Sequence, residues 1–243
     1  MNSPATMLLK FGKKEHLSSL QDGHLYLSPI KTFREDKSVF RGDAMEGSLP
    51  FNPSKFSLVL DGHPCSFNDL GIPTPTKITG FKQSDNVYIS CFAIIDDNIL
   101  VRSQFSATTY IFSDAFKEHM SQFGSYVLLL NIHEVIERLQ VAINSYTQNT
   151  VFIAEPVQYR DLSSFSEESD YLHSYSGRNP RYDLYFVKDS HYNQQNEWRI
   201  LFGADIGHLS PNNGEAYSLD IGALSWSHIY EADWFLKNFQ IID

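Results

Sequence analysis

The chain has 243 residues, of which 42% are hydrophobic and 20% charged, a balance typical of a globular protein that buries a sizeable core. Its net charge of −10 argues against broad, sequence-independent binding to nucleic acid, because such binding needs many cations to displace the counterions of the phosphates. No apolar run approaches the ~20 residues that cross a bilayer, the start lacks a secretory signal, and two cysteines make no disulfide framework, so we expect a cytoplasmic protein that contacts no membrane.

Short strands and short helices follow one another in the first half of the chain. Leu17 and Leu20 share one face of the first expected helix, and Gly23 is placed to end it. Ser113 is a suitable N-terminal cap for the next helix. The expected order is a strand at 6–12, a helix at 13–23, a strand at 24–30, a turn at 31–36, a polar loop at 40–48, strands at 56–60 and 86–94, and a helix at 113–124.

The second half of the chain is richer in strands. We expect a strand at 125–132, a helix at 133–146, strands at 150–159, 183–187, 198–206 and 216–222, and a short strand with a closing helix at 226–239. Two polar stretches, 62–80 and 163–180, are expected to be loops, and neither divides the chain. Strands outnumber helices without regular alternation. The pattern therefore favours an α+β fold, a single domain over 1–243 with a mixed or antiparallel central sheet.

Several common chemistries lack their signatures in this sequence. There is no GxxxxGK[ST] loop, no GxGxxG after a strand and no GxSxG elbow. None of the nine histidines falls in an HExxH motif, and the two cysteines lie far apart, so no zinc site is expected. Cys91 lies inside an apolar strand, which predicts an inert core thiol and not a nucleophile.

Two groups of polar residues precede position 50. In the first, Lys10 ends one expected strand, and Tyr26 and Ser28 lie on one face of the next. The second is the Gly-bearing loop at 40–48, which carries Arg41, Asp43 and Glu46. The loop residues fit either a ligand-binding role or a plain turn built around the glycines.

A third group stands where a polar run enters an apolar strand. Residues two apart in a strand point the same way, so Gln195 and Glu197 are expected to face one cleft. Glu197 has two interpretations, a catalytic carboxylate at the rim of the cleft or a surface ion pair with Arg199 on the same strand face. Ser90 lies within a central strand, where its hydroxyl must find a hydrogen-bond partner.

These stretches resemble the ADP-ribosyltransferase superfamily, particularly the toxin-like members that modify nucleic acids in bacterial phage defence and toxin–antitoxin systems. "LLKFGKKEHLSSLQDGHLYL" resembles the opening strand–helix–strand of that superfamily, "YISCF" its central serine motif, and "QQNE" before "WRILF" the Gln-x-Glu form of its catalytic loop and strand. The opening and the "NEWRI" segment are also similar to an uncharacterised group of bacterial proteins. The resemblance implies an ADP-ribosyltransferase-like fold and NAD as the substrate.

The resemblance assigns catalysis to Glu197 and Gln195. Positive charge builds on the ribose as nicotinamide leaves NAD, and Glu197 would hydrogen-bond the ribose hydroxyl and stabilise this oxocarbenium-like state. Gln195 would orient the acceptor, and Ser90 would support Glu197 through a hydrogen bond. The structural alternative for Glu197 is a surface ion pair, and for Ser90 it is a core serine whose hydroxyl is hydrogen-bonded.

The implied cofactor-binding set surrounds the opening segment. Lys10 stands where most members of the superfamily have Arg or His and would neutralise an NAD phosphate or hold the adenosine ribose; otherwise it is a solvated strand end. Aromatic planes bind flat heterocycles, so Tyr26 and Phe33 would stack on nicotinamide, with core packing as the alternative. The set also contains Phe11, Ser28, Ser90 and Arg41.

The expected activity is therefore an NAD-dependent toxin that modifies RNA, DNA or a protein, with an antitoxin protein as a possible partner. An alternative is a non-catalytic module on the same fold that senses a nucleotide or a phage protein. A third hypothesis is a metal-dependent nuclease that uses Asp43, Glu46 and another acid.

Overall fold

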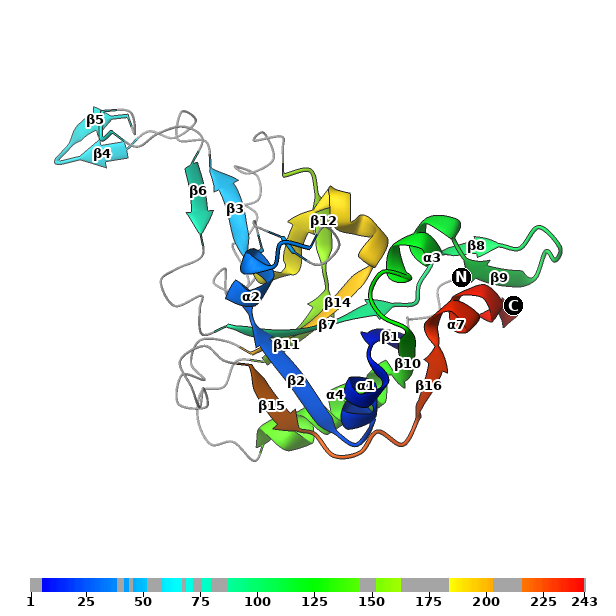
Figure 1. Cartoon of the computed structure of the whole chain (residues 1–243). Coiled ribbons are helices and arrows are strands. Elements are labelled where there is room, and N and C mark those ends of the chain that lie inside the picture. Colours follow the sequence, from blue (N-terminus) through cyan, green and yellow to red (C-terminus); the bar gives the residue numbers. More distant parts are fainter. Residues whose placement is uncertain are drawn as a thin grey trace.

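The computed structural model describes residues 6–38, 42–43, 46–51, 58–66, 69–71, 76–79, 87–144, 152–162, 184–202 and 216–242. One eight-stranded sheet organises most of this part of the chain (Figure 1). Its strands are β1 (Met7–Gly12), β2 (His24–Pro29), β7 (Tyr88–Ile94), β10 (Tyr126–Asn131), β11 (Phe152–Pro156), β14 (Glu197–Phe202), β15 (Tyr217–Asp220) and β16 (Ser227–Glu231).

The strand order of the sheet is β11-β14-β7-β1-β10-β16, and β2 pairs with both β7 and β15. Every pairing within the sheet is antiparallel. This confirms the α+β class with an antiparallel central sheet. β7 is central, as its apolar residues on both faces predicted, and all but one of its residues are buried.

One face of the sheet is covered by α1 (Lys14–Gln21) and α4 (Ile132–Asn144), which lie below the sheet in Figure 1. Leu17 and Leu20 are the buried residues of α1, as their spacing predicted. They pack with Val135 and Leu139 of α4 and with alternate residues of β1, β7, β10 and β14. This cluster, which also includes Trp198 of β14, is the larger part of the core.

The opposite face carries two smaller clusters. α3 (Asp114–Met120) and α7 (Ala232–Asn238) bury Phe116 and Phe235 against β1 and β10. α2 (Ile30–Glu35) and a 3-10 helix, η3 (Leu184–Phe186), pack Ile30 and Tyr185 against β7 and β14. Ser113 caps α3 by accepting from the backbone N–H of Phe116, as the sequence predicted. Residues 197, 199 and 201 of β14 point to this second face of the sheet, where Leu201 belongs to one of the two clusters.

Gly23 forms the tight corner between α1 and β2. Its φ of +102° lies in a region that side chains disfavour, and a Cβ at this position would come 2.4 Å from the backbone of Gly222. The corner therefore requires glycine, and after it β2 runs back to pair with β7.

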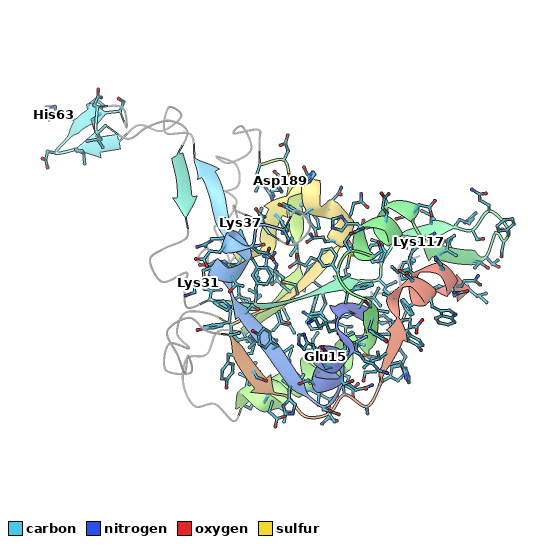
Figure 2. All side chains as sticks on the ribbon, in the orientation of Figure 1. Glu15, Lys31, Lys37, His63, Lys117 and Asp189 are labelled. Carbon is cyan, nitrogen blue, oxygen red and sulfur yellow. The ribbon has the colours of Figure 1, made fainter. Side chains whose placement is uncertain are left out.

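The remaining strands form small sheets. These are β3 (Ser48–Phe51) with β6 (Thr76–Thr79), β4 (Leu58–Leu60) with β5 (His63–Cys65), β8 (Leu100–Arg102) with β9 (Thr109–Phe112) and β17 (Ile241–Ile242), and β12 (Gln158–Arg160) parallel to β13 (Val187–Asp189). A second 3-10 helix, η4 (Ser190–Gln195), begins where β13 ends, next to Asp189, which is labelled in Figure 2.

Three local predictions were wrong. Residues 31–36, expected as a turn, mostly belong to helix α2. Pro29 is extended and directly precedes the helix, and Ile30 at the start of the helix is buried, which anchors it. Most of 183–187, expected as a strand, is the 3-10 helix η3, although Tyr185, Phe186 and Val187 are buried. The expected loop at 62–80 contains β5 and β6. The expected loop at 163–180 lies outside the described residues.

No helix in the described ranges is long and apolar enough to cross a membrane.

Candidate active site

A gap in the sheet creates the cleft. β7 pairs with β1 only through Ile94 and Ala93, and with β2 only through Ile89 and Tyr88. Between these two pairings, residues 90–92 face an opening between β1 and β2. The interrupted strand pairing leaves backbone groups that need other partners.

Lys10 crosses this opening from β1. Its Nζ donates to the carbonyl of Cys91 at 2.6 Å and to the Ser90 hydroxyl at 3.3 Å, and it lies 4.7 Å from the centre of the Phe92 ring. The ammonium therefore satisfies a carbonyl that a neighbouring strand would otherwise bond. Its position at the opening is compatible with the expected contact to NAD, although part of its donor capacity is engaged with β7.

The cleft at this opening has a volume of about 820 Å³ and gathers residues from distant parts of the chain. All predicted site residues that the structure describes line it: Lys10, Phe11, Tyr26, Ser28, Phe33, Ser90, Gln195 and Glu197. Arg41 lies outside the described residues. The sequence thus identified groups that share one cavity.

The rim and walls of the cleft are aromatic. Tyr26 is 62% exposed on the outer face of β2, whereas its neighbours Leu25 and Leu27 are buried. Phe11 and Phe33 are half-buried, so each is available for contact with a ligand only along part of its ring. The last residue of α3, Met120, and the residues Gln122 and Phe123 that follow it also line the cleft.

Glu197 and Gln195 converge, but not through the strand geometry that the sequence suggested. Gln195 ends η4, Glu197 begins β14, and Asn196 between them adopts a left-handed conformation with φ of 41°. The Asn196 side chain fixes this bend by donating to the carbonyl of Ile94 at 2.7 Å and to Asp96 Oδ1 at 2.9 Å. Asn is among the residues that tolerate this conformation.

The carboxylate of Glu197 belongs to a buried cluster of four charges, formed by Glu46, Lys188, Glu197 and Arg199. Arg199 Nε donates to Glu197 Oε1, and Lys188 Nζ donates to Glu197 Oε2 at 3.1 Å. Arg199 also donates two hydrogen bonds to Glu46, from Nη1 to Oε1 at 2.6 Å and from Nη2 to Oε2 at 2.9 Å. The Glu197–Arg199 pair therefore exists, but it is buried and not on the surface, with Glu197 5% and Arg199 0% exposed.

Opposite charges keep this cluster ionised. Burial by itself would raise the pKa of Glu197, but Arg199 and Lys188 hold that pKa well below its ordinary value of 4.5. Burial would lower the pKa of Lys188, but Glu197 and Glu46 raise it above its ordinary value. Glu197 is therefore a carboxylate at neutral pH, and Lys188 is an ammonium.

Ser90 does not share a face with Glu197. In the β7–β14 register, Glu197 is paired with Ala93 and Ile200 with Ser90, so Glu197 and Ser90 point to opposite faces of the sheet. The hydroxyl of Ser90 accepts from Lys10. This placement speaks against direct support of Glu197 by Ser90 and connects Ser90 instead to the opening beside β1.

Cys91 and Tyr159 complete the surroundings of Glu197. Partial burial, followed by the charge of Glu197, raises the pKa of the Cys91 thiol, which therefore stays protonated. Cys91 is nevertheless half-buried and lines the cleft, so it is not the core residue that the sequence predicted. The Tyr159 hydroxyl accepts from the backbone N–H of Glu197 at 2.8 Å. The first residue of β14 is thus fixed through both its backbone and its side chain.

Lys188 and Tyr159 were missed by sequence reasoning. Lys188 directly follows the apolar run at 184–187. A lysine at the end of such a run was the only feature of the sequence that indicated a buried charge here. Tyr159 carried no signal, because its partner is a backbone group 38 positions away.

The acids proposed for a metal-dependent nuclease are also buried. Both oxygens of Glu46 are bonded to Arg199, and Asp43 is 4% exposed. Among the described residues, no three His, Cys, Asp or Glu side chains form a group that would hold a metal ion.

Comparisons with protein-family models, with curated proteins and with solved structures give no match to this chain.

Proposed function

We propose that the protein is an ADP-ribosyltransferase that breaks the bond between nicotinamide and ribose in NAD and transfers ADP-ribose to an acceptor. One observation carries the proposal: the site residues from the start, middle and end of the described chain line one cleft beside an ionised Glu197. An antiparallel sheet that opens between β1 and β2 is compatible with the ADP-ribosyltransferase-like fold implied by the sequence.

The cleft has the size and lining that a dinucleotide requires. Ligand pockets commonly measure roughly 300–1,000 Å³, and this one measures about 820 Å³. Its aromatic residues offer flat surfaces for nicotinamide or adenine. Although the whole chain is acidic, the lining contains several basic side chains suited to a diphosphate: Lys10, Lys13, His16 and His24.

In the proposed reaction, the glycosidic C–N bond breaks and its electron pair leaves with nicotinamide. A nucleophilic atom of the acceptor forms the new bond to the ribose carbon and releases its proton to water. Glu197 hydrogen-bonds the ribose hydroxyl and stabilises the positive charge of the transition state. A preorganised group of this kind contributes about 3–4 kcal/mol. Gln195 orients the acceptor.

The ion pairs of Glu197 are compatible with this role. An ionised carboxylate has about four lone-pair positions, and Arg199 and Lys188 together supply two bonds, one to each oxygen. Further positions on the same oxygens suit a ribose hydroxyl. The two cations keep the group ionised and immobile, which is the condition for electrostatic stabilisation without reorganisation.

The same ion pairs favour a second candidate function. Two cations beside Glu197 neutralise part of the charge that would stabilise the ribose cation. A non-catalytic module that senses a nucleotide or a phage protein would use the same cleft without that charge. It would bind its ligand and leave NAD intact.

The acceptor is proposed to be a nucleic acid or a protein of the bacterial cytoplasm, and an antitoxin protein is the proposed partner. The test is to incubate purified protein with NAD labelled in the adenylate, together with total RNA, DNA or lysate protein. We expect label in one fraction and at least a hundredfold less with Glu197→Gln, compared at a temperature at which circular dichroism shows both proteins to be folded. Labelling by Glu197→Gln at the wild-type rate would contradict the proposal, and binding of NAD without turnover would favour the sensing module.

A further inference from the structure

Lys188 connects the two residues assigned to catalysis. Its Nζ donates to Gln195 Oε1 at 2.7 Å and to Glu197 Oε2 at 3.1 Å, and all three side chains line the cleft. The Lys188 side chain is only 4% exposed.

Such a connection is needed because the backbone does not align the two groups. Gln195 ends a 3-10 helix and Glu197 begins a strand, and the left-handed Asn196 turns the chain between them. Strand alternation therefore does not set their relative direction. Lys188 comes from β13, a separate element, and can fix both side chains from outside the bend.

Lys188 is itself held in place. Its ammonium lies 4.9 Å from the centre of the Tyr192 ring, and the Tyr192 hydroxyl donates to the carbonyl of Gly42 at 2.8 Å. Glu46 lies 3.8 Å away on the other side. The ammonium is therefore enclosed by an aromatic face and two carboxylates, which leaves it little freedom to move.

We propose that Lys188 is a positioning residue of this site, whose ammonium sets the direction of both the Gln195 amide and the Glu197 carboxylate toward the cleft. The catalytic part of this role rests on the proposed function. Because Lys188 donates to the Gln195 oxygen, the Nε2 group of that amide points away from the Lys188 ammonium.

The first experiment measures nicotinamide release by Lys188→Met, which keeps the length of the side chain and removes its charge. A small displacement of reacting groups costs about a hundredfold in rate, so we expect kcat to fall by about this factor while KM changes little. Lys237→Met is the matched control, because Lys237 is an exposed lysine on α7 that does not line the cleft. Its kcat should equal that of the wild type.

Chemical rescue separates positioning from a general loss of structure. In Lys188→Ala, methylammonium should restore part of kcat, and tetramethylammonium at the same ionic strength should not, because it has no N–H to donate. Wild-type kcat in Lys188→Met would overturn the inference while leaving the proposed function intact, and so would equal effects of the two cations in Lys188→Ala.

A second experiment does not depend on NAD chemistry or on the folding of a Lys188 variant. In the wild-type protein, NMR should detect a slowly exchanging Lys188 ammonium with a cross-relaxation peak to the Gln195 side chain. The ¹³C signal of the Glu197 carboxyl, assigned by its loss in Glu197→Gln, should show no titration down to pH 4. The charged or titratable groups that face this carboxyl are Glu46, Cys91, Tyr159, Lys188 and Arg199.

The outcomes of the two experiments are separable. If the wild type releases no nicotinamide, the proposed function fails, and the NMR spectra alone decide the placement of Lys188. A rapidly exchanging ammonium without a peak to Gln195 would overturn the inference whatever the enzyme does.

Discussion

The two walls of the cleft are built in different ways. The open wall, formed by β1, α1 and β2, presents exposed or half-buried side chains, among them Lys10 and the 62% exposed Tyr26. The buried wall is formed by Lys188, Gln195, Glu197 and Arg199, which are at most 6% exposed. Ion pairs join the three charged residues, and a hydrogen bond from Lys188 joins Gln195 to them. The difference suggests a division of work in which the open wall binds the ligand and the buried wall holds reacting groups rigidly.

The largest expected effect on folding comes from Arg199 in the buried wall. Arg199→Met leaves Glu46 and Glu197 buried with one cation fewer, and breaking a buried ion pair costs about 3–5 kcal/mol. Urea unfolding should show this loss in the free energy of unfolding. Arg102→Met, at an exposed arginine on β8, should stay within about 0.5 kcal/mol of the wild type. Equal stabilities of the two variants would remove the distinction between the walls.

Acid should act through the buried wall as well. The pKa of Glu197 is lowered on folding, so its ionised form adds stability that is fully present above its unfolded value of about 4.5 and is lost as the pH falls below that value toward the folded pKa. We expect the free energy of unfolding to fall more steeply between pH 4.5 and 3 in the wild type than in Glu197→Gln. Identical slopes would show that Glu197 is not held ionised by its partners.

A smaller effect is expected at Lys10, where the open wall meets the sheet. Lys10→Met removes the bond to the Cys91 carbonyl, which should cost about 1 kcal/mol of stability. It should also weaken NAD binding about tenfold, measured by calorimetry, if the amine contacts the ligand. Lys37→Met, at an exposed lysine labelled in Figure 2, is the control for loss of charge. Unchanged NAD affinity in Lys10→Met would limit Lys10 to a structural role.

The smallest effect on folding is expected at Tyr26. Tyr26→Ala should change stability by no more than about 0.5 kcal/mol, because the side chain is mostly exposed. It should nevertheless weaken NAD binding several-fold, whereas Tyr26→Phe keeps the ring and should bind normally. Trp234→Ala, at an aromatic residue that is 56% exposed away from the cleft, should bind NAD like the wild type. Equal affinities of Tyr26→Ala and Trp234→Ala would exclude stacking on Tyr26.

The sequence was sufficient for the elements whose signals are local. The spacing of Leu17 and Leu20 predicted the buried face of α1, and Ser113 was predicted as the N-terminal cap of α3. The apolar residues of 86–94 predicted a central strand. The shared cleft of Lys10 and Glu197 followed from a resemblance in the order of short motifs. Local patterns therefore recovered the α+β class, and the resemblance selected residues that line one cleft.

The rest depended on contacts between distant residues. Nothing near Glu197 in the sequence shows that Lys188 bonds its carboxylate or that Tyr159 accepts from its backbone. The left-handed Asn196 replaced the expected strand alternation, because its side chain bonds the end of β7 about 100 positions away. Ser90 was assigned to Glu197 before the register was known, and the register places it on the opposite face.

The most direct measurement is the steady-state rate of nicotinamide release from NAD by the wild type, Glu197→Gln and Tyr26→Ala, each shown to be folded. Loss of one group that stabilises the transition state lowers kcat about a hundred- to a thousandfold. We expect this loss in Glu197→Gln with little change in KM, and a raised KM with nearly normal kcat in Tyr26→Ala. Nicotinamide release by Glu197→Gln at the wild-type rate, or none by the wild type, would contradict the assignment of catalysis to the buried wall.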